Sequence, residues 1–263
     1  MSPSYVNRCA SPSAQMHEIG HNLGLRHSNE DGNTYADQTG MMGYSYPQEN
    51  GPAMCFNNAK NWQFGWYENR HTTVSPLTDQ HWNGELVSYV DYLNSAGKTV
   101  VLKVEGHTRD YFIGFNRKAG INSGNMEEDA VNKVTIHSVG TSGIESELEA
   151  KLGIGGSFEI PDFGGGVNSV LIEVGFIDMT SDPPIAEVSV VLWKCTSNED
   201  CDDGSACTTN TCNVSQGTCI HEPNDSCLSS LKMVLLTDKY PSETSWVSTN
   251  IFRSVLYCTL KPI

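Results

Sequence analysis

The sequence has few basic residues and no long apolar run. It contains 16 Lys and Arg against 31 Asp and Glu among 263 residues, which gives a formal net charge of −15. A chain of this charge repels phosphate backbones and anionic lipid surfaces. No stretch approaches the roughly 18 uncharged apolar residues that a membrane-spanning helix requires. We therefore expect neither nucleic-acid binding nor a membrane span.

Cysteines, by contrast, are abundant in one segment that has hardly any apolar residues. Six of the nine cysteines fall there: Cys195, Cys201, Cys207, Cys212, Cys219 and Cys227. The segment has no C-x2-C pair of the kind that binds zinc. Disulfides hold small modules of this composition together, and they persist in oxidising compartments. We therefore predict a disulfide module over residues 195–230 of an extracellular protein, with the pairing left open.

The remaining cysteines are Cys9, Cys55 and Cys258, an odd number. Cys9 and Cys55 flank the motif described next and could pair across it, which would leave Cys258 without a partner in this chain. In the cysteine-rich segment, Asn213 and Asn224 each begin an N-x-S sequence and are glycosylation candidates. The first residues have neither the basic nor the apolar region of a secretory signal peptide. We expect that leader to belong to a longer protein.

The strongest motif is HExxHxxGxxH over residues 17–27. On a helix, His17 and His21 project from one face one turn apart, so both imidazoles can reach a single ion. Gly24 then ends the helix and lets the chain turn, so that His27 completes the site. Three neutral imidazoles with one open position are typical of a catalytic zinc site, at which Glu18 accepts a proton from the attacking water.

Local signals around this motif predict a helix. Ser11 is a suitable N-cap and Pro12 suits the first helical position. An apolar stripe lies at helical spacing on the face away from the ligands: Met16, Ile19, Gly20 and Leu23. We expect that stripe to be buried against another part of the protein.

The eleven-residue pattern resembles the metzincin metallopeptidases, and residues 15–28 resemble most the gametolysin family of secreted algal peptidases. This resemblance implies a methionine turn below the zinc, for which residues 40–44 are suited, with Met42 as the turn methionine. It leaves two readings of Tyr44, as a fifth ligand or transition-state donor, or as a packed turn residue. It also implies that residues 55–67 close the lower part of the catalytic domain, and that the substrates are cell-wall or matrix glycoproteins.

Metzincins build the upper half of the cleft from a sheet and a helix that precede the active-site helix, and only sixteen residues precede His17 here. That upper half provides the edge strand on which a substrate docks, and it covers the apolar stripe. We therefore expect this chain to be part of a longer protein. Expressed alone, it is expected to bind zinc weakly and to show little peptidase activity.

From residue 85 onward the pattern changes to short alternating apolar runs, which predict strands. These runs are 86–90, 99–104, 111–115, 131–136, 169–174 and 186–192. The predicted fold is α+β and mostly β. It comprises the lower half of a metzincin catalytic domain (1–80), an antiparallel β-sandwich (81–194), the cysteine-rich module (195–230) and the start of a further β module (231–263).

Two functions compete on this sequence. The first is a secreted zinc metalloendopeptidase with His17, His21 and His27 as ligands and Glu18 as general base. The second is a non-catalytic extracellular adhesion or matrix-binding protein that carries an incomplete peptidase site. The intact Glu18 favours the enzyme. The other histidines are interpreted as surface or core residues: His71, His81, His107, His137 and His221.

Overall fold

The computed structural model describes residues 11–44, 46, 51–79, 81–95, 97–106, 108–140, 145–163, 168–193, 195–214 and 217–224. The chain divides into two compact units, Met1–Trp193 and Lys194–Ile263. Within the part that is described, no helix is both long and apolar enough to cross a membrane. The predicted further β module over residues 231–263 lies outside the described residues.

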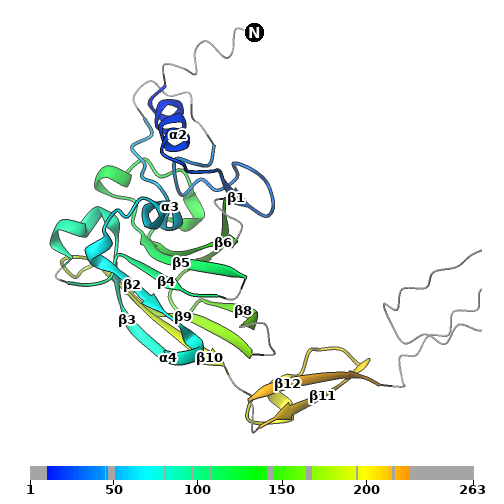
Figure 1. Cartoon of the computed structure of the whole chain (residues 1–263). Helices are drawn as coiled ribbons and strands as arrows, with labels where there is room; N and C mark the ends of the chain where they lie inside the picture. Colours follow the sequence, from blue (N-terminus) through cyan, green and yellow to red (C-terminus); the bar gives the residue numbers. More distant parts are fainter. Residues whose placement is uncertain are drawn as a thin grey trace, which may run out of the picture. The chain divides into compact units, whose positions relative to one another are not determined.

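The first unit is built on two β-sheets (Figure 1). One has six strands in the order β1-β7-β6-β5-β4-β2, and the other has four in the order β3-β10-β9-β8. The strands of the first sheet are β1 Ser28–Glu30, β2 His71–Val74, β4 Val101–Val104, β5 Arg109–Asn116, β6 Lys133–Gly140 and β7 Ser146–Leu152. Those of the second are β3 His81–Val87, β8 Ser157–Phe163, β9 Asn168–Asp178 and β10 Ile185–Trp193.

The main apolar core lies between these two sheets. Every second side chain of β10 is buried along most of the strand, as expected for a strand with one face in a core. Ile113 and Ile136 from the six-stranded sheet share one buried cluster with Ile172 and Val188 from the four-stranded sheet. This packing of sheet on sheet confirms the predicted fold class, which is α+β and mostly β.

The sheets differ from the prediction in several strands. All six predicted apolar runs overlap observed strands, but β1, β2, β7 and β8 were not predicted. In addition, two pairs at the edges of the six-stranded sheet are parallel, β1 with β7 and β2 with β4. Parallel pairs need long connections, so the partners of β1 and β2 were not visible in any local pattern. Both β1 and β2 precede residue 80. The predicted segments 1–80 and 81–194 therefore contribute strands to the same six-stranded sheet.

Helix α2 (Pro12–Asn22) carries the first two histidines of the motif. Ser11 is its N-cap and accepts a hydrogen bond from the Ala14 amide at 3.3 Å, with Pro12 in the first turn. The helix ends at Leu23, and Gly24 follows with φ +93°. These features agree with the expected start and stop signals.

The apolar stripe of α2 is only partly covered. Gly20 is buried and Met16 packs against a cluster that contains Met42 and Phe56. Ile19 and Leu23, however, are 45% and 61% exposed. Among the described residues the stripe is therefore covered at Gly20, partly covered at Met16 and open to solvent at Ile19 and Leu23.

The other helices in the described part of the first unit are short. They are α3 Asn58–Gln63, α4 Pro76–Asp79 and the 3-10 segments η2 Glu68–Arg70, η3 Tyr89–Asn94, η4 Gly120–Asn122 and η5 Glu128–Ala130. Asn57 caps α3 by accepting a hydrogen bond from the Lys60 amide at 3.0 Å. Helix α3 packs on β5 and β6, so it covers one face of the six-stranded sheet (Figure 1).

The second unit is described over its disulfide-linked part. Strands β11 (Thr208–Asn213) and β12 (Thr218–Pro223) form a two-stranded antiparallel sheet, preceded by η6 (Asn198–Cys201). Disulfides join Cys195 to Cys212 and Cys201 to Cys219, and Cys207 is also disulfide-bonded. Cys227 lies outside the described residues. The side chains of Asp200 and Asp203 accept hydrogen bonds from nearby turn residues.

Cys55 differs from its predicted state. It was a candidate for a disulfide with Cys9, but its thiol is free and points to the carbonyl of Ile121 at 3.9 Å. Burial raises the pKa of this thiol to about 12, so it stays protonated at neutral pH. Cys9 and Cys258 lie outside the described residues.

Candidate metal centre

The three histidines of the motif converge at the end of α2. Their ring centroids are separated by 4.7 Å between His17 and His21, 5.5 Å between His17 and His27, and 4.8 Å between His21 and His27. One nitrogen from each ring lies within 4.8 Å of the others. The i, i+4 spacing explains the first pair, and the turn at Gly24 brings His27 to the same point.

Backbone carbonyls fix the orientation of two of these rings. Nδ1 of His17 donates to the carbonyl of Met41 at 2.9 Å, and Nδ1 of His21 donates to the carbonyl of Leu25 at 2.9 Å. A ring that donates from Nδ1 keeps Nε2 as a bare nitrogen with a lone pair. Metal-binding histidines commonly have this outer partner.

The electrostatics of the site suit a cation between the rings. Nε2 of His27 lies 3.1 Å from Nε2 of His21, close to the separation of two nitrogens that are each ~2.0–2.1 Å from one zinc ion in a tetrahedral site. Burial lowers the pKa of His17 and that of His27, which favours the neutral, ligating form of both rings. The donor set, three imidazoles held near one point, therefore fits a divalent metal ion.

Glu18 follows His17 on α2 and is exposed to solvent. Its negative charge acts on the His17 imidazole and raises the pKa of that ring, against the larger effect of burial. The carboxylate is thus near the ligands without being one of the grouped metal-binding side chains.

Met42 lies beneath α2. Its side chain is fully buried, and a Cβ added at Gly20 would lie 2.3 Å from the Met42 sulfur. Glycine at position 20 is therefore what lets the methionine approach the helix so closely. The carbonyl of Met42 accepts a hydrogen bond from the Ser28 amide at 2.9 Å, directly after His27.

Tyr44 and Tyr35 differ in their relation to the histidines. The ring of Tyr44 is 44% exposed and packs edge-on against Tyr46, with centroids 5.3 Å apart. Tyr35 was not singled out from the sequence. Its ring packs on that of His27, with ring centroids 4.2 Å apart. Tyr35 has φ +74°, a conformation that no local sequence pattern indicates. The tyrosine beside the triad was therefore missed.

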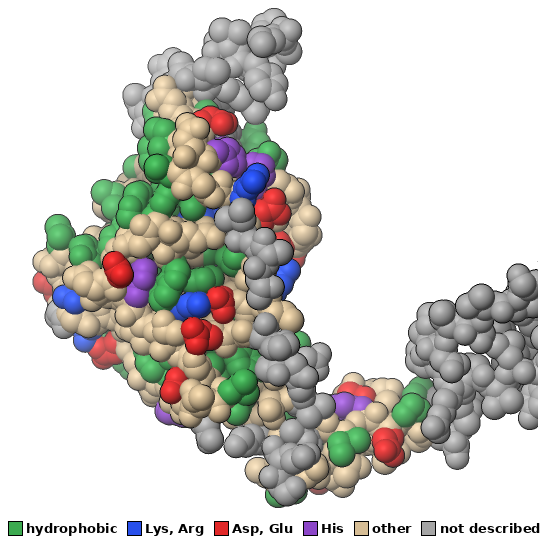
Figure 2. All heavy atoms as spheres, in the orientation of Figure 1, with side chains coloured by type: hydrophobic (Ala, Val, Ile, Leu, Met, Phe, Trp, Pro, Cys, Tyr) green, Lys and Arg blue, Asp and Glu red, His purple; other side chains and the backbone are tan. Residues whose placement is uncertain are grey.

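A pocket with a volume of about 570 Å³ opens beside the ligands. It is lined by His21, Gly24, Leu25, Arg26, His27 and Glu145. Histidine side chains gather on this part of the surface next to a basic and an acidic side chain (Figure 2). The pocket therefore gives a ligand access to the metal-binding nitrogens while presenting one charge of each sign.

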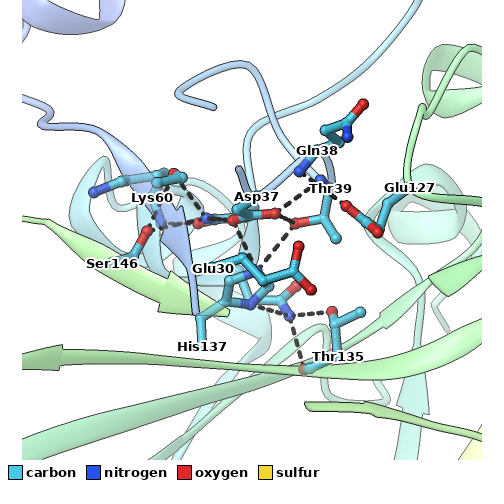
Figure 3. A network of polar contacts seen from close by, with 12 residues as sticks. Glu30, Asp37, Gln38, Thr39, Lys60, Glu127, Thr135, His137 and Ser146 are labelled. Atoms are coloured by element: carbon cyan, nitrogen blue, oxygen red, sulfur yellow. Dashed lines mark hydrogen bonds and ion pairs between the residues drawn. The ribbon is translucent and has the colours of Figure 1, made fainter. Parts of the chain in front are cut away.

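Sequence reasoning also missed a buried polar network below the site (Figure 3). Asp37 and His137 are both 0% exposed, with Oδ2 of Asp37 lying 3.3 Å from Nε2 of His137. His137 was interpreted as a surface or core residue, and it lies in the core. No signal could have paired it with Asp37, because 100 residues separate the two positions along the chain.

The remaining predicted residues are not among the side chains grouped around the candidate metal site in the described part of the chain. His71 stacks on Trp62 with centroids 4.1 Å apart, His81 is exposed on β3 and His221 is paired with Asn210 in the second unit. His107 lies outside the described residues. Asn213 ends β11, and Asn224 donates to the carbonyls of Ala206 and Thr208. Glycosylation at both asparagines stays a prediction.

Comparison with known proteins identifies the family. A sequence model described as Gametolysin peptidase M11 matches residues 1–147. No curated protein and no solved structure gives a significant match. The matched part includes the histidine motif, the Met42 turn and the buried network up to β7. Because it covers more than half of the 263 residues, the chain belongs to the gametolysin family of metallopeptidases.

Proposed function

We propose that this protein is a secreted zinc-dependent endopeptidase. The observation that carries the proposal is the convergence of His17, His21 and His27 with Glu18 beside them. The outer hydrogen bonds of His17 and His21 leave one bare nitrogen on each ring. The three histidines would hold the ion, and Glu18 would act on the water.

The donor set supports zinc over other metals. Three imidazoles without a thiolate or a carboxylate match a hydrolytic zinc site that keeps one open position. When bound there, zinc lowers the pKa of a water molecule and polarises the carbonyl of the scissile peptide bond. Glu18 would accept a proton from the attacking water and then deliver it to the departing amine.

The open pocket supports a polypeptide substrate. Since it adjoins His21 and His27 and is open to solvent, a side chain of an extended peptide can enter it while the scissile bond lies at the histidines. Arg26 and Glu145 on its lining can contact polar groups of the peptide. Cell-wall or matrix glycoproteins are the substrates that the family resemblance suggests.

The disulfides support secretion. Two are described in the second unit, and Cys207 is bonded as well. Such bonds persist in oxidising compartments and are rare in a reducing cytosol. The disulfides are therefore the observation that supports secretion in this proposal.

The test combines metal analysis with a peptidase assay. With zinc in excess, the full chain should bind about one zinc ion per molecule and cleave casein at the low rate expected above for the chain expressed alone, with this activity lost on chelation and restored by zinc. Glu18→Gln should keep the metal but lose cleavage by ~100-fold or more, the scale of general-base catalysis. His21→Ala should lose both the metal and activity.

His81→Ala provides the matched control, because His81 is an exposed histidine on β3. It should bind zinc and cleave casein as the unchanged protein does. Full activity of Glu18→Gln would contradict the proposed mechanism. Metal binding without cleavage by the unchanged chain would favour the non-catalytic adhesion protein instead.

A further inference from the structure

We propose that Asp37 and His137 are positioning residues for the metal site. Together they anchor the segment of residues 35–43, here called the 35–43 loop, to β6 of the sandwich. The proposal rests on the proposed function, because it concerns how the metal ligands are held. If so, the β-sandwich helps to position the metal site, a role that the sequence of the strands did not indicate.

The 35–43 loop contacts the metal site at three points. Tyr35 packs on His27, the Met41 carbonyl accepts from Nδ1 of His17, and Met42 lies under α2 at Gly20. Two of the three ligand side chains therefore depend on where this loop lies. A displacement of the loop would rotate the His17 ring or remove the support of the His27 ring.

The carboxylate of Asp37 accepts hydrogen bonds from inside the 35–43 loop and from Asn57. One carboxylate oxygen accepts from the Thr39 amide at 2.8 Å and from the Thr39 hydroxyl at 2.5 Å. The other accepts from Nδ2 of Asn57 at 2.8 Å. These bonds and the nearby His137 keep the pKa of the buried Asp37 carboxyl below its ordinary value, even though burial acts in the opposite direction. The donors of Thr39 and Asn57 thus replace water around the buried carboxylate and stabilise its charged form.

His137 links this carboxylate to the sheet (Figure 3). Because the amide Nδ2 of Asn58 can only donate, Nδ1 of His137 accepts from it at 3.4 Å, which leaves Nε2 as the donating nitrogen of the ring. Nε2 then donates to the Thr39 hydroxyl at 3.0 Å, with the Asp37 carboxylate 3.3 Å away. The hydroxyl, in turn, donates to Asp37, so every proton in this part of the network has an acceptor.

The position of His137 on β6 explains how it reaches the loop. Successive side chains of a strand point to opposite faces of the sheet, so His137 lies on the face opposite to that of Ile136. Ile136 belongs to the core between the sheets. His137 lies instead on the side of the sheet where Asn58 of α3 and the 35–43 loop contact it.

Two further contacts restrict the loop to one position. Nδ2 of Asn57 donates to Ser28 on β1 at 3.0 Å and to Ser146 on β7 at 3.1 Å, besides Asp37. A Cβ added at Gly43 would lie 1.7 Å from the Asp37 carbonyl, so the two ends of the loop touch. The chain of contacts thus runs from β6 through Asp37 and Thr39 to Met41 and His17.

The competing interpretation is that the network only stabilises the fold. A purely structural role would lower the thermal midpoint but leave the geometry and affinity of the metal site unchanged. A positioning role changes the metal site even in variants that remain folded. Outer partners of metal ligands commonly change affinity by ~10–100-fold when they are removed.

The experiment uses the full chain loaded with Co²⁺, whose visible absorption reports ligand geometry. We would compare His137→Leu, Asp37→Asn and Thr39→Val, after showing that each unfolds cooperatively on heating. Binding would be measured at a temperature below the thermal midpoint of every variant. We expect their Co²⁺ dissociation constants to rise by ~10–100-fold, with an altered absorption spectrum. His137→Gln keeps an N–H donor near the position of Nε2 and should recover most of the affinity.

Ile136→Ala is the matched control, because Ile136 is the neighbour of His137 on the same strand but belongs to the core between the sheets. It should lower the thermal midpoint and leave Co²⁺ affinity and spectrum unchanged. Unchanged Co²⁺ affinity in Thr39→Val and Asp37→Asn would overturn the proposal. So would an equal loss of affinity in Ile136→Ala.

The same measurements separate this proposal from the proposed function. If the unchanged chain binds Co²⁺ and the variants weaken it, but no peptide is cleaved, the positioning role stands and the peptidase function fails. If the unchanged chain binds Co²⁺ and cleaves casein while the variants bind Co²⁺ equally well, the positioning role fails and the function stands.

Discussion

The carbonyl oxygen of Met41 lies 2.9 Å from Nδ1 of His17. This contact joins the turn under the candidate metal site to the helix that carries the first two proposed ligands. It fixes which nitrogen of His17 carries the proton, and it thereby leaves Nε2 for the metal. The Met41 amide in turn donates to the Cys55 carbonyl at 3.0 Å, so the turn is held on its other side as well.

The first prediction concerns Gly43, which lies against the Asp37 carbonyl at the end of the 35–43 loop. Gly43→Ala would place a methyl group 1.7 Å from the Asp37 carbonyl, and neither backbone segment can yield without moving the loop. We expect a loss of about 3 kcal/mol in the free energy of unfolding, at the upper end for an overpacked site. Urea denaturation measures it. Gly140→Ala, where nothing lies within 4 Å of the added Cβ, should change the free energy of unfolding little.

A second prediction concerns the contact between Gly20 and Met42. Alanine at position 20 would favour the helix by ~0.5–1 kcal/mol but would meet the Met42 sulfur at 2.3 Å. Gly20→Ala should therefore be destabilising alone and stabilising in a Met42→Ala background. A double-mutant cycle of urea-unfolding free energies measures this coupling. Additive effects of the two substitutions would contradict the close approach.

The third prediction follows from the buried Lys60 on α3. Burial lowers the pKa of Lys60 to about 7, against about 10.4 for an exposed lysine. Between these two values the unfolded chain binds a proton that the folded chain does not, so the contribution of Lys60 to stability increases with pH. Lys60→Met should therefore exceed the unchanged protein in stability most below pH ~7, and the difference should shrink toward pH ~10.

Lys60→Arg tests the same linkage from the other side. A guanidinium stays protonated over this range, so the variant cannot release the proton. Its stability should fall further below that of the unchanged protein as the pH rises. Chemical denaturation at a series of pH values measures all three proteins, and parallel curves would show that Lys60 does not titrate in this range.

The fourth prediction concerns the disulfides of the second unit. A two-stranded sheet is at best marginally stable alone, so β11 and β12 depend on the Cys195–Cys212 and Cys201–Cys219 bonds. Cys201→Ser paired with Cys219→Ser should collapse the dispersed amide NMR signals of β11 and β12. Signals of the first unit should not move. Cys55→Ser, which replaces a free thiol, should leave the signals of β11 and β12 in place.

Local spacing was sufficient to predict the convergence of the three histidines and much of the sheet framework. His17 and His21 lie one helical turn apart, and His27 follows after a single glycine turn, so short-range geometry already brings them together. Strands β9 and β10 were predictable because alternating apolar side chains mark a strand with one buried face. The clustered cysteines likewise indicated disulfides without showing their pairing.

The support of the site depends on contacts between distant parts of the chain. His137 reaches Thr39 across 98 residues, and Ser146 reaches Asn57 across 89. No local pattern encodes such pairs, because a buried polar side chain is tolerated only when the fold brings a partner to it. The same reason applies to Tyr35, whose left-handed backbone turns its ring onto His27. The three histidines could therefore be predicted from the sequence. The Asp37 and His137 contacts that hold the 35–43 loop could not, because they form only where the sandwich packs against that loop.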